Sequence, residues 1–170
     1  QQIESFKNTF LYFFSFQGLI LYLITLVFVK SLHELGHAFV SKYFGCRVSS
    51  IGIAFLVFFP FLYTDTSDAW RLRDHKDRLL INFAGILTEL HLALISTFLW
   101  AILPDGGLKS VAFFIATTSW ISSLAINVSP FMRFDGYYVF SDWLKAENLQ
   151  PRSFALARWQ LREILFGFNH

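Results

Sequence analysis

The 170-residue sequence contains one cysteine, Cys46, and few charged side chains. A single cysteine excludes a disulfide bond within the chain and a zinc site built from cysteines. Charged residues make up 15% of the sequence and the net charge is +2, which is too weak a balance to indicate a nucleic-acid partner. The sequence also has neither an initiator methionine nor a signal-peptide pattern with a cleavage site. We therefore expect it to be a piece of a longer protein, with flanking regions on both sides.

Apolar residues dominate what is present, at 55% of the chain, with 19% aromatic residues that include 22 phenylalanines. This composition is typical of a membrane domain. Phe10–Val29 is uncharged over its whole length, and it is long enough to cross the bilayer core as a helix. We predict an all-α polytopic membrane protein with three core transmembrane helices, over residues 10–44, 79–103 and 110–136.

Between the first two predicted spans, residues 46–78 do not resemble a simple loop. Val48–Leu62 is rich in Val, Ile and Phe and is interrupted by glycine and proline, which predicts a small membrane-associated β segment. Asp65 and Asp68 are candidate N-caps for a short charged helix over Trp70–Arg78. Because open strand edges are unfavourable in lipid, this segment should lie at the membrane surface or inside protein.

Loop charges predict the orientation of the spans. The second connection carries one basic residue, Lys109, whereas the first carries five: Arg47, Arg71, Arg73, Lys76 and Arg78. The positive-inside rule therefore places residues 45–78 and the C-terminal segment in the cytoplasm. Within that segment, residues 153–168 carry Arg158 and Arg162 beside apolar side chains, which predicts an amphipathic interfacial helix or a further membrane helix.

A zinc-binding pattern lies at the end of the first apolar run. His33-Glu34-Leu35-Gly36-His37 fits H-E-x-x-H, in which the two histidines project from one face of a helix and can bind one Zn²⁺ ion. Glu34 lies beside them, where it can take a proton from water as the general base. Ionisable residues inside a membrane span are costly and usually functional.

A catalytic zinc site normally uses three protein ligands, so a third ligand is needed. The candidates are Glu89, His91 and Asp135. Asp135 follows the third predicted span at its cytoplasmic end, at the depth expected for His33 and His37, whereas Glu89 should lie deeper in the membrane. Depth therefore favours Asp135.

A second motif accompanies the first: Asn127, Pro130, Asp135 and Gly136 fit N-x-x-P-x-x-x-x-D-G. With both motifs in separate spans, the chain resembles the site-2 protease family of intramembrane zinc metalloproteases. The resemblance implies His33, His37 and Asp135 as zinc ligands and Glu34 as the general base. The stretches Tyr63–Trp70 and Arg133–Tyr138 resemble a subgroup of large bacterial members with adaptor-like domains, which implies the bacterial cytoplasmic membrane.

Several polar residues remain as accessory candidates. Lys30 lies one helical turn before the histidines and can pair with Glu89 or line a wet cleft. Asn127 can hydrogen-bond an oxyanion, orient the substrate backbone or cap the broken helix. Asn82 and Glu89 share a helical face, and His91 is expected to hydrogen-bond between helices.

The sequence as a whole predicts hydrolysis of a peptide bond in a membrane-embedded or membrane-associated peptide substrate, with the lipid bilayer as the surrounding partner. We expect the strand near Val48–Phe58 to bind such a substrate in extended form by edge addition. One alternative is a catalytically idle membrane module whose zinc site is structural. The other is a peptide or metal transport component, which predicts paired repeats of broken helices, and the sequence contains no internal repeat.

Overall fold

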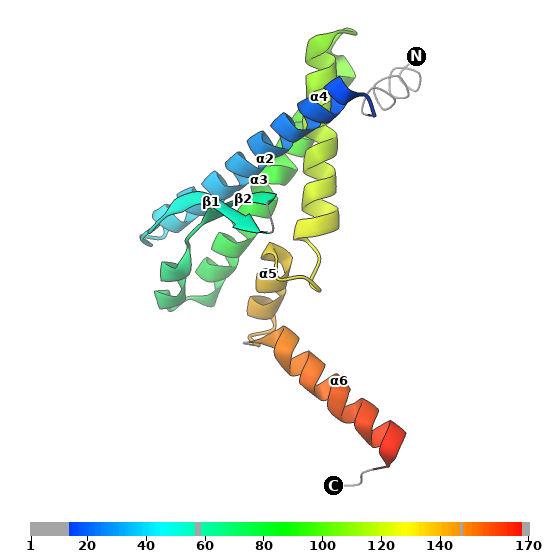
Figure 1. Ribbon diagram of the computed structural model, residues 1–170. Coiled ribbons are helices and arrows are strands. Elements are labelled where there is room, and N and C mark those ends of the chain that lie inside the picture. Colours follow the sequence, from blue (N-terminus) through cyan, green and yellow to red (C-terminus); the bar gives the residue numbers. More distant parts are fainter. Residues whose placement is uncertain (1–13, 57–58, 147, 168–170) are drawn as a thin grey trace.

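The computed structural model describes residues 14–56, 59–146 and 148–167. Helices form most of it, with one two-stranded sheet between the first two helices (Figure 1). In chain order the elements are α2 (Phe16–Tyr43), β1 (Ile51–Leu56), β2 (Phe59–Thr64), the 3-10 turn η1 (Ser67–Arg71), α3 (His75–Ile102), α4 (Gly107–Trp120), the π-helical segment η2 (Ile121–Asn127), α5 (Asp135–Trp143) and α6 (Leu149–Phe166).

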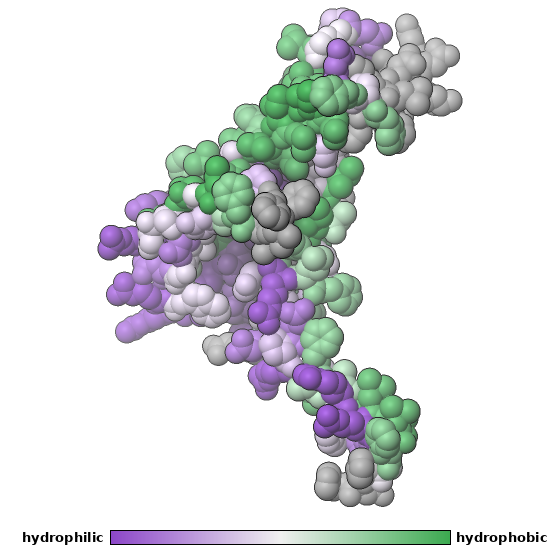
Figure 2. All heavy atoms as spheres, in the orientation of Figure 1, coloured by the Kyte–Doolittle hydropathy of each residue, from purple (hydrophilic) through white to green (hydrophobic). Residues whose placement is uncertain are grey.

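The helices α2, α3 and α4 pack against one another as the central bundle (Figure 1). Within the described ranges, three helical stretches are long and apolar enough to cross a membrane: α2, α3, and α4 together with η2. Figure 2 shows hydrophobic side chains covering the upper part of the bundle and hydrophilic ones gathering at its lower end. Exposed apolar residues of α2 and α3 include Leu23, Ile24, Leu94 and Phe98. The chain is therefore an integral membrane protein with the predicted fold; residues 10–13 of the first expected span lie outside the described residues.

The predicted β segment forms an antiparallel hairpin of β1 and β2, in which Ile53 lies opposite Leu62. The Thr64 hydroxyl donates a hydrogen bond to the backbone carbonyl of Glu34 at 3.0 Å. This bond fixes the end of β2 to α2 within the H-E-x-x-H motif. The hairpin is thus held directly beside the predicted site.

The short helix expected over Trp70–Arg78 does not form. Instead η1 makes a single 3-10 turn, and α3 begins at His75 and runs without interruption into the apolar span. The reason is the N-cap of α3, which is Asp74: its carboxylate accepts a hydrogen bond from the backbone N–H of Lys76 at 2.9 Å.

Asp65 and Asp68, the expected caps of that helix, have other roles. The carboxylate of Asp65 accepts from the backbone N–H of Ser67 at the start of η1. The carboxylate of Asp68 accepts from the backbone N–H of Arg47 at 2.8 Å, and so fixes η1 to the chain that leaves α2.

The third span is shorter than the predicted 110–136. It widens into the π-helical segment η2, ends at Asn127, and is followed by an irregular stretch before α5 begins at Asp135. Pro130 lies in that stretch, and it has no N–H with which to continue a helix. Asp135 therefore belongs to a separate short helix, not to the transmembrane helix.

The helix α6 extends away from the bundle (Figure 1). It covers the expected C-terminal helix up to Phe166 and begins at Leu149, earlier than predicted. It has no buried residue, and hydrophobic side chains gather on one of its sides (Figure 2). This pattern is typical of a helix that lies at a membrane surface.

Candidate metal centre

The two histidines of the H-E-x-x-H motif lie on one face of α2, in its C-terminal half, and both are buried. Their Nε2 atoms face each other at 3.2 Å. The Nδ1 atom of His37 donates a hydrogen bond to the backbone carbonyl of Ile81 on α3 at 2.8 Å. Because Nδ1 carries the proton in that bond, a neutral His37 directs the free lone pair of Nε2 toward His33.

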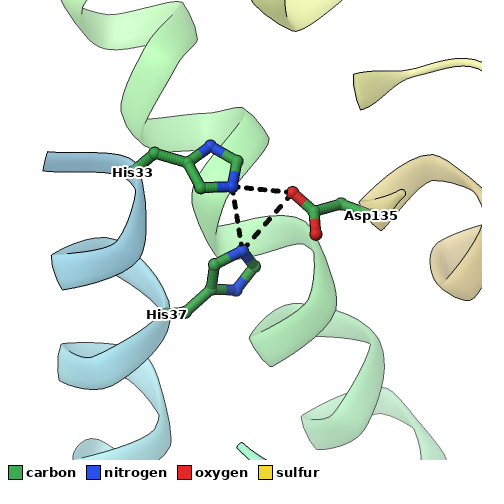
Figure 3. A group of neighbouring side chains, drawn as sticks. All are labelled: His33, His37 and Asp135. Carbon is green, nitrogen blue, oxygen red and sulfur yellow. Dashed lines mark hydrogen bonds and ion pairs between the residues drawn. The ribbon is translucent and has the colours of Figure 1, made fainter. Parts of the chain in front are cut away.

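Asp135 completes a three-residue group with these histidines (Figure 3). Its Oδ2 atom lies 2.9 Å from Nε2 of His33 and 3.4 Å from Nε2 of His37. The carboxylate comes from the first residue of α5, whereas both imidazoles come from α2. The fold therefore brings Asp135, the third ligand that the expected membrane depth favoured, to the two histidines.

The three residues fit a zinc ion. The donor set is two imidazole nitrogens and one carboxylate oxygen, as in many catalytic zinc sites. Ligand atoms around one tetrahedral zinc ion lie about 3.4 Å apart, close to the observed separations of 2.9–3.4 Å. In addition, Oδ2 of Asp135 is buried, and its close contacts with the two imidazoles do not have the geometry of hydrogen bonds. Such an atom is costly to bury unless it binds an ion.

A cleft of about 360 Å³ opens onto this group. Glu34, His37 and Asp135 lie in its wall, together with the end of β2 over residues 62–64. Glu34 is only half-buried and lies on the motif helix, so its carboxylate has access to water in the cleft. The cleft therefore places Glu34, the candidate general base, with two of the three candidate ligands and a strand around one space.

Gly85 brings α3 close to both imidazoles. A Cβ atom at this position would overlap the rings of His33 and His37. Only glycine permits this approach, which also places the carbonyl of Ile81 within hydrogen-bond distance of His37. The sequence alone did not predict this contact.

Glu89 lies on the same helix, and its side chain is completely buried. Its Oε1 atom forms an ion pair with Nζ of Lys30 at 2.7 Å. This pairing is one of the two roles predicted for Lys30. Glu89 also accepts hydrogen bonds from Ser122 at 3.1 Å and from the side-chain amide of Asn127 at 2.9 Å. Its Oε1 atom lies 3.0 Å from Nδ1 of His33.

Two other predicted residues lie apart from the three-residue group. Asn127 is buried and its amide contacts Glu89, so that contact joins η2 to α3. The expectation for His91 is wrong: it is exposed, and its Nδ1 donates to the carbonyl of Leu87 on its own helix. A short bond to the preceding turn replaces the predicted bond between helices.

The sequence of the chain has been compared with known families and proteins. A family model described as Peptidase family M50 matches residues 19–106, while none of the curated proteins matches the chain. The matched segment contains His33, Glu34 and His37 but ends before Asp135, so the third member of the group is placed by the fold alone. Since the match covers just over half of the chain, the protein belongs to peptidase family M50, the site-2 protease family, and is a metallopeptidase of the site-2 protease type.

Proposed function

We propose that the protein is a zinc-dependent intramembrane endopeptidase that hydrolyses a peptide bond of a membrane-embedded or membrane-associated peptide. The observation that carries this proposal is that His33, His37 and Asp135 meet beside a cleft whose wall contains two of them and Glu34. A purely structural zinc site would need neither the cleft nor a carboxylate beside the ligands. Family membership supports the peptidase activity.

The chain's own residues have distinct roles in this reaction. His33, His37 and Asp135 hold the zinc ion, which supplies the Lewis acidity that polarises a carbonyl group and lowers the pKa of water. Glu34 accepts a proton as water attacks the carbonyl carbon, and then passes that proton to the leaving amine. The hydrogen bond from His37 to the carbonyl of Ile81 keeps one imidazole oriented throughout.

The hairpin supplies a means of binding an extended substrate. The strand that lines the cleft is β2, not β1. The backbone N–H of Asp65 donates to the carbonyl of Ser50 at 2.9 Å, so the alternation of an antiparallel pair directs the backbone groups of Leu62 and Thr64 away from β1. A substrate that pairs with this outer edge would lie in the cleft with its carbonyl groups unwound from helix.

The position of the site favours cleavage near the cytoplasmic face. Arg78 lies in the wall of the cleft, and it belongs to the basic connection that the positive-inside rule assigns to the cytoplasm. A bacterial cytoplasmic membrane follows from the resemblance of Tyr63–Trp70 and Arg133–Tyr138 to large bacterial members. Flanking regions of the same chain are expected partners of this domain.

The decisive experiment is the Glu34→Gln substitution. The purified protein is placed in lipid vesicles with a panel of single-span transmembrane peptides, and products are identified by mass spectrometry. Loss of the general base should lower the cleavage rate by about 10²–10⁴-fold, while bound zinc, measured by elemental analysis, stays at the wild-type level. If Glu34→Gln cleaves at the wild-type rate, or if the wild type holds zinc and cleaves nothing in the panel, a structural zinc site becomes the better interpretation.

A further inference from the structure

Glu89 is a completely buried carboxylate in an apolar transmembrane helix, so its presence needs a physical reason. A carboxylate in such a place is costly unless it is paired and hydrogen-bonded. Glu89 meets that condition with partners from two other elements: Lys30 on α2, and Ser122 and Asn127 on η2. These three contacts explain how the group is tolerated, but not what it does.

The fourth contact indicates a role. Oε1 of Glu89 lies 3.0 Å from Nδ1 of His33. The opposite nitrogen of the same ring, Nε2, faces His37 and Asp135. The imidazole of His33 thus lies between the carboxylate of Glu89 on one side and His37 and Asp135 on the other. Nδ1 of His33 has no hydrogen-bond partner among the described residues, and its 3.0 Å ion-pair contact with Oε1 of Glu89 is the one close polar contact recorded for it there.

The geometry also excludes Glu89 as the third ligand. A carboxylate that contacts Nδ1 lies on the far side of the ring from Nε2, where the ligand atoms converge. The group of atoms close enough to share one ion contains His33, His37 and Asp135, without Glu89. Glu89 therefore stands outside the ligand set.

We propose that Glu89 is a positioning residue of the metal centre, a statement that rests on the proposed zinc site. Its carboxylate holds the proton of His33 on Nδ1 and fixes the ring, so that Nε2 presents its lone pair to the ion. Carboxylates in this outer position orient histidine ligands and raise their basicity. His37 is held in the same way, by the backbone carbonyl of Ile81. Both imidazoles are thus fixed at Nδ1, the nitrogen opposite the metal position, by atoms of α3.

Asn127 and Ser122 extend this arrangement to the third span. Their hydrogen bonds hold Glu89 from η2, the segment that precedes the loop leading to Asp135. Asn127 therefore acts through Glu89 on His33, in place of a direct contact with substrate. Lys30 forms an ion pair with Glu89 and balances its charge.

A simpler interpretation is that Glu89 only neutralises Lys30. The double variant Lys30→Met/Glu89→Gln separates the two interpretations, because it removes both charges together and leaves no unpaired buried charge. If Glu89→Gln alone fails to fold, the double variant still allows the test. Asp142→Asn is the matched control: Asp142 is another buried carboxylate that accepts a hydrogen bond from an asparagine of α3, Asn82 at 2.7 Å.

The full chain is purified in detergent, and zinc affinity is measured by competition with a chromogenic chelator. The visible absorption spectrum of the Co²⁺-substituted protein reports the geometry of the ligands, which a purely structural substitution does not change. We expect the double variant to bind zinc about 10–100-fold more weakly than the wild type, with an altered cobalt spectrum. Asp142→Asn should match the wild type in both measurements.

If the double variant matches the wild type in zinc affinity and cobalt spectrum, Glu89 is only the counter-ion of Lys30 and the inference is overturned. If the wild type binds no zinc, the inference and the proposed function both fall. If the double variant loses affinity as expected but the wild type cleaves no peptide, the positioning role stands and the proposed function alone is refuted.

Discussion

The close approach of Gly85 to the histidines leads to a sharp prediction for Gly85→Ala. A Cβ atom here would lie 2.5 Å from Nε2 of His37, where ordinary contact begins at 3.4 Å. It would meet the ring of His33 as closely. The rings, or the whole of α3, must withdraw to admit a single methyl group.

The magnitude follows from these distances. A withdrawal of about 0.9 Å is several times the tolerance of a metal–ligand distance, which is about 0.2 Å. Zinc affinity should therefore fall by roughly 100-fold or more, since changes in outer contacts alone cost 10–100-fold. The free energy of unfolding should fall by only about 0–2 kcal/mol. Overpacking costs about 1–3 kcal/mol, but alanine favours a helix over glycine by about 1 kcal/mol, which offsets part of that cost.

Gly36→Ala is the matched control for this substitution. Its Cβ would meet Thr88 Oγ1 and lie 3.2 Å from the carbonyl of Ala84, so it crowds the same interface between α2 and α3 without touching an imidazole. Zinc affinity is measured by chelator competition and unfolding by thermal denaturation in detergent. Gly85→Ala should lose zinc with a modest loss of stability, whereas Gly36→Ala should keep its zinc. Wild-type zinc affinity in Gly85→Ala would refute the argument from close approach.

Three further predictions concern a ligand, the strand edge and a loop contact. Asp135→Ala should leave the purified protein with little bound zinc by elemental analysis, and full occupancy would mean that another residue is the third ligand. Leu62→Pro removes an N–H from the outer edge of β2 and should slow peptide cleavage while the hairpin persists. Tyr63→Pro instead removes an N–H that faces β1 and should disrupt the hairpin. Equal cleavage rates for Leu62→Pro and the wild type would exclude edge addition. The backbone N–H of Arg47, with a smaller contribution from the side chain of Arg71, holds the pKa of Asp68 below its usual range. Asp68 therefore stabilises the fold above about pH 4, and this contribution is lost as the pH falls through the lowered pKa. The difference in melting temperature between the wild type and Asp68→Ala should disappear in acid. A difference that stays constant with pH would contradict a stabilising role for the Asp68 carboxylate.

The spans were predictable because a bilayer imposes a simple requirement of length and apolarity. Their ends were harder to predict, since they depend on single contacts. Asp74, not Asp68, caps α3 because its carboxylate lies within reach of the Lys76 N–H. Asp68 has a partner distant in sequence, Arg47, which local pattern cannot reveal.

The site divides in the same way. His33 and His37 are fixed by helical periodicity alone, and so their pairing was predictable. Asp135 was the favoured third ligand on depth, and the resemblance implied it, but its place on a separate helix depends on how the chain breaks after Asn127. The contact of Gly85 with the rings, by contrast, arises from the packing of α3 on α2, for which an isolated glycine in an apolar run gives no distinct signal.

The break in the third span connects the two halves of the centre. Upstream of it, Asn127 holds Glu89, which contacts His33 from behind. Downstream of it, Gly136 packs so closely on the backbone of Asn127 and Val128 that a Cβ atom there would overlap both. That packing fixes the start of α5, where Asp135 faces the histidines. One short stretch of chain therefore positions the carboxylate ligand directly and an imidazole ligand indirectly. A continuous helix through Asn127 would move Asp135 about two turns further along its axis, away from the histidines, so the break is a condition for assembling the ligands and not a by-product of Pro130.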